Sequence, residues 1–315
     1  MQFSDPNADN YGGNPYNYGG NPSMAGGIRR RRPVSQRNRG CMGCLTTVFI
    51  LALLGALIGF IFNISVVWGG TTIQVATAPT LIIKNETYNN SVVNKSIVHI
   101  HANESNNQIH ITPIHLLNIP VGLQELYQIS SDRRTVIYDI GSSLPGTTDI
   151  TVPAQTNLIV YTNSTTFEIE GITGRMLLET NSGELVVKNC HLTSSSLINS
   201  NTGMITVTAS QLSGTVTMGN NTADIAFQGS LEPNGVYSFA NNGGDIKLTL
   251  PQNSAMHIDA TTNSHGTITS NIPQAQAQPL YSGFALHVDE GATPRAQLSL
   301  YNNNGSIIIN EQGGN

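Results

Sequence analysis

The sequence has few charged residues and few cysteines, and each shortage excludes a class of protein. Charged side chains make up 10% of the 315 residues, well under the roughly 25% of an average soluble domain. Three cysteines are too few for the disulfide framework of a small secreted scaffold. Helical periodicity is absent outside one apolar segment, whereas Gly is abundant at 31 residues. This composition favours turn-rich β structure over a helical bundle.

Common catalytic and nucleotide-binding motifs are also absent. The sequence contains no G-x-S-x-G, H-E-x-x-H, P-loop or dinucleotide-binding fingerprint. An enzyme needs a convergent set of acid, base or nucleophilic groups, and no such set stands out. We therefore expect a non-enzymatic protein with no catalytic residues and no cofactor.

The charge is distributed unevenly along the chain. Residues 1–44 carry six arginines against two aspartates, a net +4, whereas residues 69–315 carry eight basic and seventeen acidic side chains, a net −9. A domain of that negative charge repels phosphate backbones. Nucleic acid is therefore excluded as a partner of the C-terminal region.

One uncharged apolar run, Leu45–Val67, is the candidate for a membrane span. Its 23 residues would form a helix that crosses a hydrocarbon core of about 30 Å. The arginines precede the run, so the positive-inside rule places the N-terminus in the cytoplasm. The sequence thus predicts a signal anchor over 45–68 in the lipid bilayer of the cell membrane, with residues 69–315 extracytoplasmic. A signal peptide cleaved after Ala78 is the alternative.

The residues before this run have a low-complexity composition. The pentapeptide Tyr-Gly-Gly-Asn-Pro occurs twice, at 11–15 and 18–22, and such a composition cannot bury enough surface to fold. We expect a disordered cytoplasmic tail over 1–44, either a spacer or a weakly self-associating segment. Cys41 and Cys44 match C-x-x-C but lack a second pair for zinc.

The strongest pattern is a recurring turn motif of Asn, a small residue, Gly and a polar residue, followed by alternating aliphatic positions. Successive copies begin 18, 20, 20, 21, 22 and 39 residues apart. A period near 20 with two short strands and Asn/Gly corners is what a β-solenoid requires. The copies start at Asn163, Asn181, Asn201, Asn221, Asn242, Ser264 and Asn303.

The alternation within each copy predicts which side chains face the interior. In the copy at Asn181, Leu185 and Val187 would point inward, and in the next copy Ile205 and Val207 would do so. Coils stacked about 4.8 Å apart would join these pairs into one core, and the corner Asn side chains could hydrogen-bond in ladders. A sandwich of antiparallel hairpins is the structural alternative, but it does not predict the same turn residues every 20 positions.

We predict an all-β fold, a parallel β-solenoid preceded by one transmembrane helix and a disordered tail. Residues 69–149 are less regular and are expected to supply a linker, an N-terminal cap and the first coils, with Ser105 opening a degenerate motif copy. Residues 150–315 form the repetitive part, with an insertion near 271–294. Gln297–Asn310 would form the last coil before the C-terminal cap.

The chain resembles a known bacterial family at this point. The runs 149–153, 244–251 and 304–309, together with the repeated Asn-[Ser/Thr]-Gly turns, are similar to the bacterial "putative adhesin" domains of unknown function over roughly residues 75–310. The resemblance implies a parallel β-solenoid on the outside of a bacterial cell. It supplies no catalytic residues to carry over.

Two sets of side chains are candidates for metal binding. Glu184, Asp224 and Asp245 occupy the fourth motif position, and the two aspartates would lie one coil apart, about 5 Å. They could bind Ca²⁺ or act on a glycan, or they could simply be polar residues at the strand entry.

The second set is His99, His101 and His110, which could face one another across a turn and hold zinc or copper, or could form an exposed polar face. The other histidines, His191, His257, His265 and His287, are scattered along the sequence.

Three functions remain open. The first is a non-enzymatic, membrane-anchored surface protein, an adhesin or envelope-binding scaffold that contacts an envelope glycan or a surface protein. The second is a single-pass envelope sensor or regulator. The third is a polysaccharide-active β-helix enzyme that uses Asp224 and Asp245.

Overall fold

The computed structural model describes residues 70–84, 96–103, 107–115, 127–140, 146–263, 266–273 and 275–312. These residues form two sheets of 13 and 12 strands, here called sheet A and sheet B, and the prediction of an all-β fold is confirmed. Sheet A consists of β1 (Thr71–Gln74), β3 (Ile97–Asn103), β4 (Gln108–His115), β7 (Gly146–Pro153), β9 (Thr166–Glu170), β10 (Thr173–Gly174), β12 (Leu185–Lys188), β13 (His191–Leu192), β15 (Ile205–Leu212), β17 (Ile225–Leu231), β19 (Ile246–Pro251), β21 (Ile268–Ser270) and β25 (Ile307–Gln312). Sheet B consists of β2 (Thr80–Lys84), β5 (Tyr127–Ile129), β6 (Thr135–Asp139), β8 (Asn157–Thr162), β11 (Met176–Thr180), β14 (Ser196–Ser200), β16 (Thr215–Asn220), β18 (Val236–Asn241), β20 (Met256–Thr262), β22 (Gln278–Leu280), β23 (Gly283–Glu290) and β24 (Ala296–Asn302).

The predicted tail and the predicted membrane span cannot be compared with the described residues. The tail over 1–44 and the membrane span over 45–68 lie outside the described residues. Across the ranges that are described, no helix is long and apolar enough to cross a membrane.

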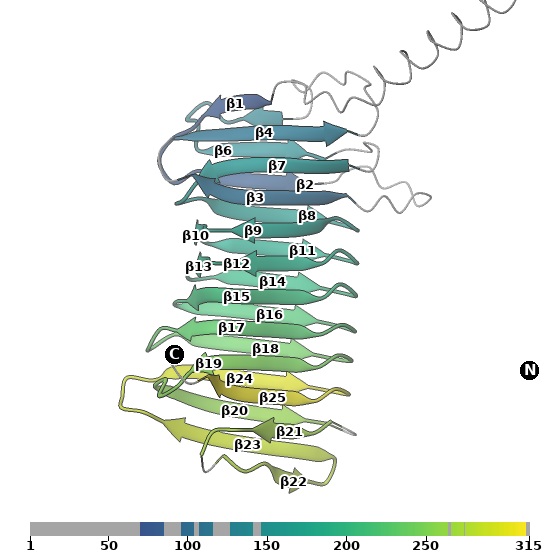
Figure 1. The fold of residues 1–315 in the computed structure, drawn as a ribbon, viewed down its shortest axis with the longest axis vertical. Helices are drawn as coiled ribbons and strands as arrows, with labels where there is room; N and C mark the ends of the chain where they lie inside the picture. Colours follow the sequence, from purple (N-terminus) through teal and green to yellow (C-terminus); the bar gives the residue numbers. More distant parts are fainter. Residues whose placement is uncertain are drawn as a thin grey trace, which may run out of the picture. The chain divides into compact units, whose positions relative to one another are not determined.

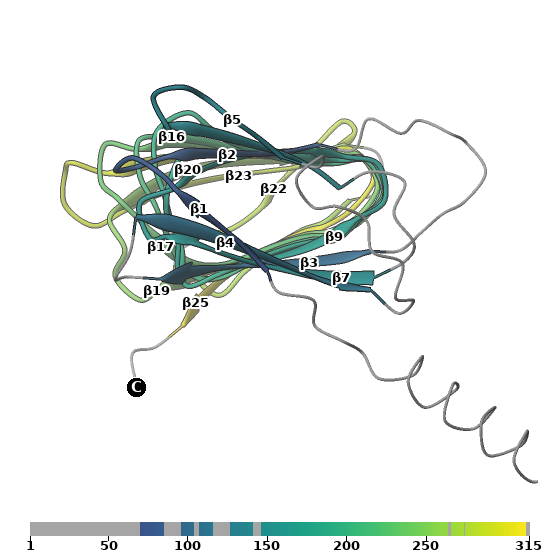
Figure 2. The same cartoon turned by 90° about the horizontal axis from the view of Figure 1, so that it is seen from above.

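Strands of neighbouring repeats pair in parallel, one repeat length apart. In sheet A, Leu185 of β12 pairs with Phe167 of β9 on one side and with Ile205 of β15 on the other. Leu185, Val187 and Ile205 are fully buried, as the alternation predicted. Parallel pairing across the repeats excludes the sandwich of antiparallel hairpins. Figure 1 shows the resulting coils lying one above the other, and Figure 2, viewed along the stack, shows the two sheets facing each other across the core.

The predicted asparagine ladder is present at the corner between the sheets. Each side-chain amide donates to the amide oxygen of the preceding corner, for example Asn201 Nδ2 to Asn181 Oδ1 at 2.8 Å. Each such bond contributes about 1 kcal/mol, since it replaces a bond to water. The motif start at Ser264 lies outside the described residues, and its neighbour Asn263 joins the ladder. The ladder runs through Asn163, Asn181, Asn201, Asn221, Asn242, Asn303 and Asn263.

A second ladder, which the sequence reasoning missed, lies one residue earlier and is buried. Asn220 Nδ2 donates to the Gly203 carbonyl at 2.7 Å, while its Oδ1 accepts from Ala223 N at 3.2 Å. Gly203 N in turn donates to Ser200 Oγ at 2.9 Å. A Cβ on Gly203 would collide with the carbonyl of Gly183 in the neighbouring coil, so the motif glycine is required by close backbone approach.

The order of coils in the stack departs from their order in the sequence at both ends. At the N-terminal end, the coil of β2 and β3 lies between β6/β7 and β8/β9. At the C-terminal end, the coil of β24 and β25 lies between β18/β19 and β20/β21. The two-strand coils of the described chain are therefore stacked as β6/β7, β2/β3, β8/β9, β11/β12, β14/β15, β16/β17, β18/β19, β24/β25 and β20/β21.

Antiparallel strands cover both ends of the stack. β4 pairs antiparallel with β7 and carries β1, and β5 pairs antiparallel with β6. At the other end, β23 pairs antiparallel with β20, and β22 follows it. Ser105, which was expected to open a motif copy, lies outside the described residues, and the strand that follows it, β4, runs antiparallel to β7 as a cap strand. Gln297–Asn310 is the last coil along the chain but not the last in the stack, because two strands pair with β24 in parallel, one on each side.

Candidate functional site

The outer face of sheet B carries a shallow hollow of about 570 Å³ beside the asparagine ladder. Its floor is made by two small residues that are cross-strand partners, Gly219 of β16 and Ala240 of β18. Glu179 and Asn199 continue the same row of outward positions on one side. Tyr301 of β24 closes the row on the other side, with 43% of its side chain exposed. The small residues leave room between a polar wall and an aromatic wall.

The ladder gives this hollow a set of fixed amide groups. Three ladder residues line the hollow: Asn201, Asn221 and Asn242. Each uses one N–H and one oxygen lone pair in hydrogen bonds to its ladder neighbours. A primary amide has two N–H groups and two lone pairs, so each amide keeps bonding capacity for a ligand. Among the described residues, Glu179 is the charged residue of the lining, and no basic side chain lines the hollow.

The two candidate aspartates are neighbours, as predicted, but their oxygens already have partners. Asp224 Oδ1 accepts from Asp245 N at 2.9 Å, and Asp245 Oδ1 accepts from Ser306 N at 2.9 Å. Lys247 Nζ lies 2.6 Å from Asp224 Oδ2 and 4.0 Å from Asp245 Oδ2. Burial alone would raise the pKa of Asp224, but the bonds from Lys247 and Asp245 outweigh it and hold the pKa below its usual value. The pair thus bridges coils, and Lys247 balances one of its two negative charges.

The three candidate histidines share one outer face of sheet A but contact different partners. His99 Nδ1 lies 3.2 Å from Glu168 Oε2. His101 Nε2 lies 2.9 Å from Thr151 Oγ1, and His110 Nδ1 lies 2.9 Å from Thr72 Oγ1. β7 runs between the strand of His99 and His101 and the strand of His110. The structure therefore places them on one surface without converging their nitrogens.

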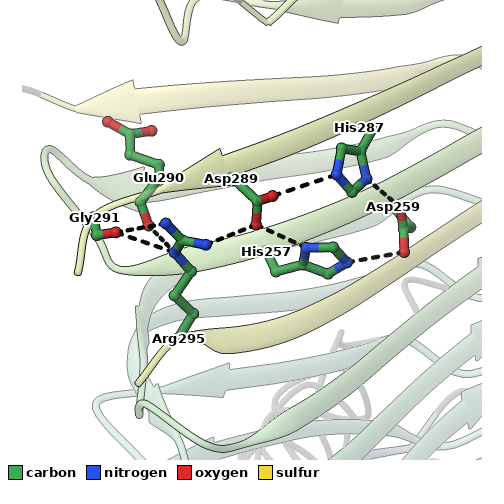
Figure 3. Close-up of polar contacts among 7 residues, drawn as sticks. All are labelled: His257, Asp259, His287, Asp289, Glu290, Gly291 and Arg295. Atoms are coloured by element: carbon green, nitrogen blue, oxygen red, sulfur yellow. Dashed lines mark hydrogen bonds and ion pairs between the residues drawn. The ribbon is translucent and has the colours of Figure 1, made fainter. Parts of the chain in front are cut away.

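Two histidines that look scattered in the sequence are brought together at the C-terminal end of sheet B. β20 and β23 pair antiparallel, so that His257 faces Asp289 and Asp259 faces His287. In each strand the residue between the His and the Asp is buried; this residue is Ile258 in β20 and Val288 in β23. The four polar side chains therefore project from the outer face as a compact group (Figure 3).

Each imidazole lies between the two carboxylates. His257 Nδ1 is 2.9 Å from Asp289 Oδ1, and its Nε2 is 3.1 Å from Asp259 Oδ2. His287 Nδ1 is 2.8 Å from Asp259 Oδ1, and its Nε2 is 3.4 Å from Asp289 Oδ2. The bond to Asp289 outweighs desolvation and raises the pKa of His257. The bond to His287 lowers the pKa of Asp259, and the bond to His257 lowers that of Asp289.

A sequence signal for this group exists, although the sequence reasoning passed over it. The tripeptide His-aliphatic-Asp occurs at 257–259 and again at 287–289. Alternation puts the His and the Asp of each copy on one face of a strand. The antiparallel register of β20 and β23 brings the two copies together.

Comparison with known proteins gives a family and two distant structural matches. A sequence model of the family described as Toastrack DUF4097 matches residues 73–309. A structure described as a "putative cell adhesion protein" from Clostridium sporogenes has 12% identity and a TM-score of 0.31, and the match covers 77% of this chain and 99% of that one. A "putative adhesin" from Bacteroides fragilis has 9% identity and a TM-score of 0.35, with coverage of 77% and 96%. No curated protein matches the chain.

Proposed function

Since the chain belongs to the Toastrack DUF4097 family, we propose that it is a membrane-anchored, non-enzymatic cell-surface protein. In this proposal the stacked β-domain binds a neutral glycan chain of the cell envelope on the outer face of sheet B. The observation that carries it is the hollow between the asparagine ladder and Tyr301.

The chemistry of the hollow suits a sugar better than an ion or an apolar ligand. A tyrosine ring offers an apolar face with a polar tip, which can contact the C–H face of a sugar ring. Fixed amides supply both donors and acceptors for hydroxyl groups. In the part of the chain that the structure describes, the lining has no basic residue and includes Glu179, so an anionic ligand would be repelled.

The outer face of sheet B also has a continuous row of outward-pointing residues that could contact a long ligand. The outward row that contains Gly219 continues across the parallel strands from Tyr161 of β8 to Tyr301 of β24. Both tyrosines are 43% exposed. Five strand spacings of about 4.8 Å separate them, roughly 24 Å, which suits a chain of several sugar units.

Binding is favoured over catalysis because the two neighbouring aspartates, Asp224 and Asp245, already have hydrogen-bond and ion-pair partners. Asp224 and Asp245 hold backbone N–H groups and Lys247, which leaves them poorly placed to donate a proton to a glycosidic oxygen. The anchor in this proposal is Leu45–Val67, with the N-terminus in the cytoplasm and residues 69–315 outside. A role as an envelope sensor would depend on the tail over 1–44.

The test is a glycan array probed with purified full-length protein, comparing wild type with Tyr301→Ala. Loss of an aromatic stacking partner is expected to weaken binding about tenfold, since such contacts contribute on the order of 1 kcal/mol beyond buried area. Tyr281→Ala is the matched control, because Tyr281 is fully exposed on the turn after β22 and lies outside the hollow.

Two results would contradict the proposal. One is wild-type affinity in Tyr301→Ala together with reduced affinity in Tyr281→Ala. The other is an array on which the wild-type protein binds no neutral glycan.

A further inference from the structure

We propose that His257, His287 and Asp259 bind a divalent transition-metal ion of the zinc type at the C-terminal end of sheet B. The three side chains offer one ligand atom each, and these atoms lie within 4.8 Å of one another. The site lies on β20 and β23, apart from the glycan-binding hollow. The metal-site proposal can therefore be tested independently of the proposed glycan binding.

The surroundings decide on which side of the two rings the ion lies. On one side, Asp289 already bonds a cation, because Arg295 Nη1 is 3.0 Å from Asp289 Oδ1. Arg295 is held there by the carbonyls of Glu290 and Gly291, at 2.9 to 3.1 Å from its guanidinium nitrogens. A metal ion on that side would be repelled by the guanidinium. On the other side, Asp259 faces one nitrogen of each ring (Figure 3).

The positions of the two carboxylates are compatible with the tautomers that metal binding requires. Each imidazole gives a lone pair to the metal, His257 from Nε2 and His287 from Nδ1. The opposite nitrogen of each ring then carries the proton: His257 Nδ1 donates to Asp289 Oδ1, and His287 Nε2 lies 3.4 Å from Asp289 Oδ2. A carboxylate behind a ligating histidine orients the ring and increases its basicity. Asp289 is therefore a positioning residue, and Arg295 holds it in place.

The donor set selects the class of metal. Two imidazole nitrogens and one carboxylate suit Zn²⁺, Co²⁺, Ni²⁺ or Cu²⁺, whereas Ca²⁺ and Mg²⁺ require oxygen ligands. Three protein ligands leave a position of a tetrahedral ion for water. His287 and Asp259 are each 61% exposed, so the side chains can move outward to bond lengths of about 2.0–2.1 Å.

Such an ion would add a further connection between two elements that already pair as strands. Asp259 and His257 belong to the last coil of the stack, whereas His287 belongs to the cap strand β23. Binding to the folded state alone raises stability in proportion to the logarithm of metal concentration. The metal would thus fasten the cap hairpin to the end of the stack.

The test is calorimetric titration of untagged full-length protein with ZnCl₂ at about pH 8, above the ordinary imidazole pKa of about 6.5. Cys41 and Cys44 are replaced by Ser in every variant, because a C-x-x-C pair could bind zinc by itself. We expect saturation at one equivalent and a rise in Tm with zinc, but no rise with CaCl₂. His287→Ala is expected to abolish both effects, and Asp289→Asn to weaken binding about 10- to 100-fold at unchanged stoichiometry.

The matched control is the double variant His99→Ala/His101→Ala, which removes exposed histidines of sheet A and should bind zinc as the parent does. The proposal is overturned if that control loses binding while His287→Ala retains it, or if the parent shows no saturation. If Asp289→Asn binds zinc as tightly as the parent does, the assignment of the ion to the Asp259 side of the two imidazole rings would be contradicted.

Discussion

The middle of the stack and its two ends are built by different rules. From β8 to β19, coils that are consecutive in the sequence are also neighbours in the stack, and the corner asparagine recurs from coil to coil. At the ends, a coil from one part of the sequence is inserted between two others, and antiparallel strands close the sheet. Local repetition therefore specifies the middle, whereas contacts between distant segments specify the ends.

This difference matters for function, because both candidate sites depend on the C-terminal insertion. Tyr301 lies next to Ala240 only because β24 pairs with β18. His257 and Asp259 pair with β23 only because β20, and not β24, is the outer strand. The ends of the stack thus supply the side chains that distinguish this chain from a plain repeat.

The largest expected contrast comes from deleting one coil in each region. Removing residues 201–220 joins Ser200 to Asn221 and preserves the motif, so we expect a shorter stack with Tm changed by less than about 5 °C. Removing residues 296–312 deletes four buried aliphatic residues, at least about 6 kcal/mol of burial, and leaves a gap inside the stack. We expect loss of cooperative unfolding, measured by circular dichroism. The deleted core residues are Leu298, Leu300, Ile307 and Ile309.

Equal tolerance of the two deletions would show that coil order at the C-terminal end does not matter. The internal deletion also serves as the control for chain length, because it removes slightly more residues than the terminal one.

A smaller effect on the free energy of unfolding tests whether the buried ladder continues from the middle coils into the inserted coil of β24 and β25. Asn220 belongs to a middle coil and Asn302 to the inserted coil, and each donates at 2.7 Å to a carbonyl of the neighbouring coil, that of the buried Gly203 or the half-buried Gly244. We expect Asn220→Ala and Asn302→Ala to lose a similar amount, about 2 kcal/mol each, because a carbonyl and an N–H that are largely shielded from water lose their partners. Urea denaturation measures both free energies of unfolding.

The exposed ladder supplies the control, since water can replace the lost amide in Asn221→Ala and the cost should stay under about 1 kcal/mol. A clearly smaller loss in Asn302→Ala than in Asn220→Ala would indicate that the inserted coil is held less firmly than the middle.

The smallest expected effect is a pH dependence at Asp224, which links two middle coils. Its pKa is lowered in the folded state, so its contribution is present above the unfolded pKa of about 3.9 and is lost as pH falls through the folded value. The group is 34% exposed, and solvent screening limits the contribution to about 0.5 kcal/mol. Asp224→Asn should therefore lower stability slightly at neutral pH and flatten the loss of stability in acid.

Thermal unfolding at several pH values between about 2 and 7 measures this slope. Asp149→Asn, on the outer face of β7, is the control variant, and an identical acid slope in wild type and Asp224→Asn would contradict the role of the carboxylate.

The sequence predicted the middle of the stack closely because its signals are local. The spacing of Asn181 and Asn201 gave the corner ladder, and the alternation around Leu185 gave the core. The buried ladder was missed because its position accepts Thr, Ser or Asn, which share hydrogen-bonding ability but not identity. Its described members are Thr180, Ser200, Asn220, Asn241 and Asn302.

The sites could not be predicted in the same way. Tyr301 is 61 residues away from its neighbour Ala240, and His287 is 28 residues away from Asp259. The motif puts Ala240 and Tyr301 at equivalent positions, but it does not specify which coils are neighbours, and no repeat relates His287 to Asp259. Both contacts therefore depend on which strand inserts where. The two His-aliphatic-Asp tripeptides were visible in the sequence, but their antiparallel register was not.

The most direct test of this account is the order of the coils at the C-terminal end, measured by disulfide formation between engineered cysteines. Lys247 of β19 is paired with Ile308 of β25, which in turn is paired with Thr269 of β21. The test uses a chain without Cys41 and Cys44. Cys190 can remain, because it is buried and burial raises the pKa of its thiol to about 11.

The account predicts that the variant Lys247→Cys/Ile308→Cys forms an internal disulfide, because paired strands lie about 4.8 Å apart. The variant Lys247→Cys/Thr269→Cys should form none, because the two Cα atoms are two strand spacings apart, about 9.6 Å. The reverse result, a disulfide in the second variant and none in the first, would show that the coils follow sequence order, and neither candidate site would then exist as described.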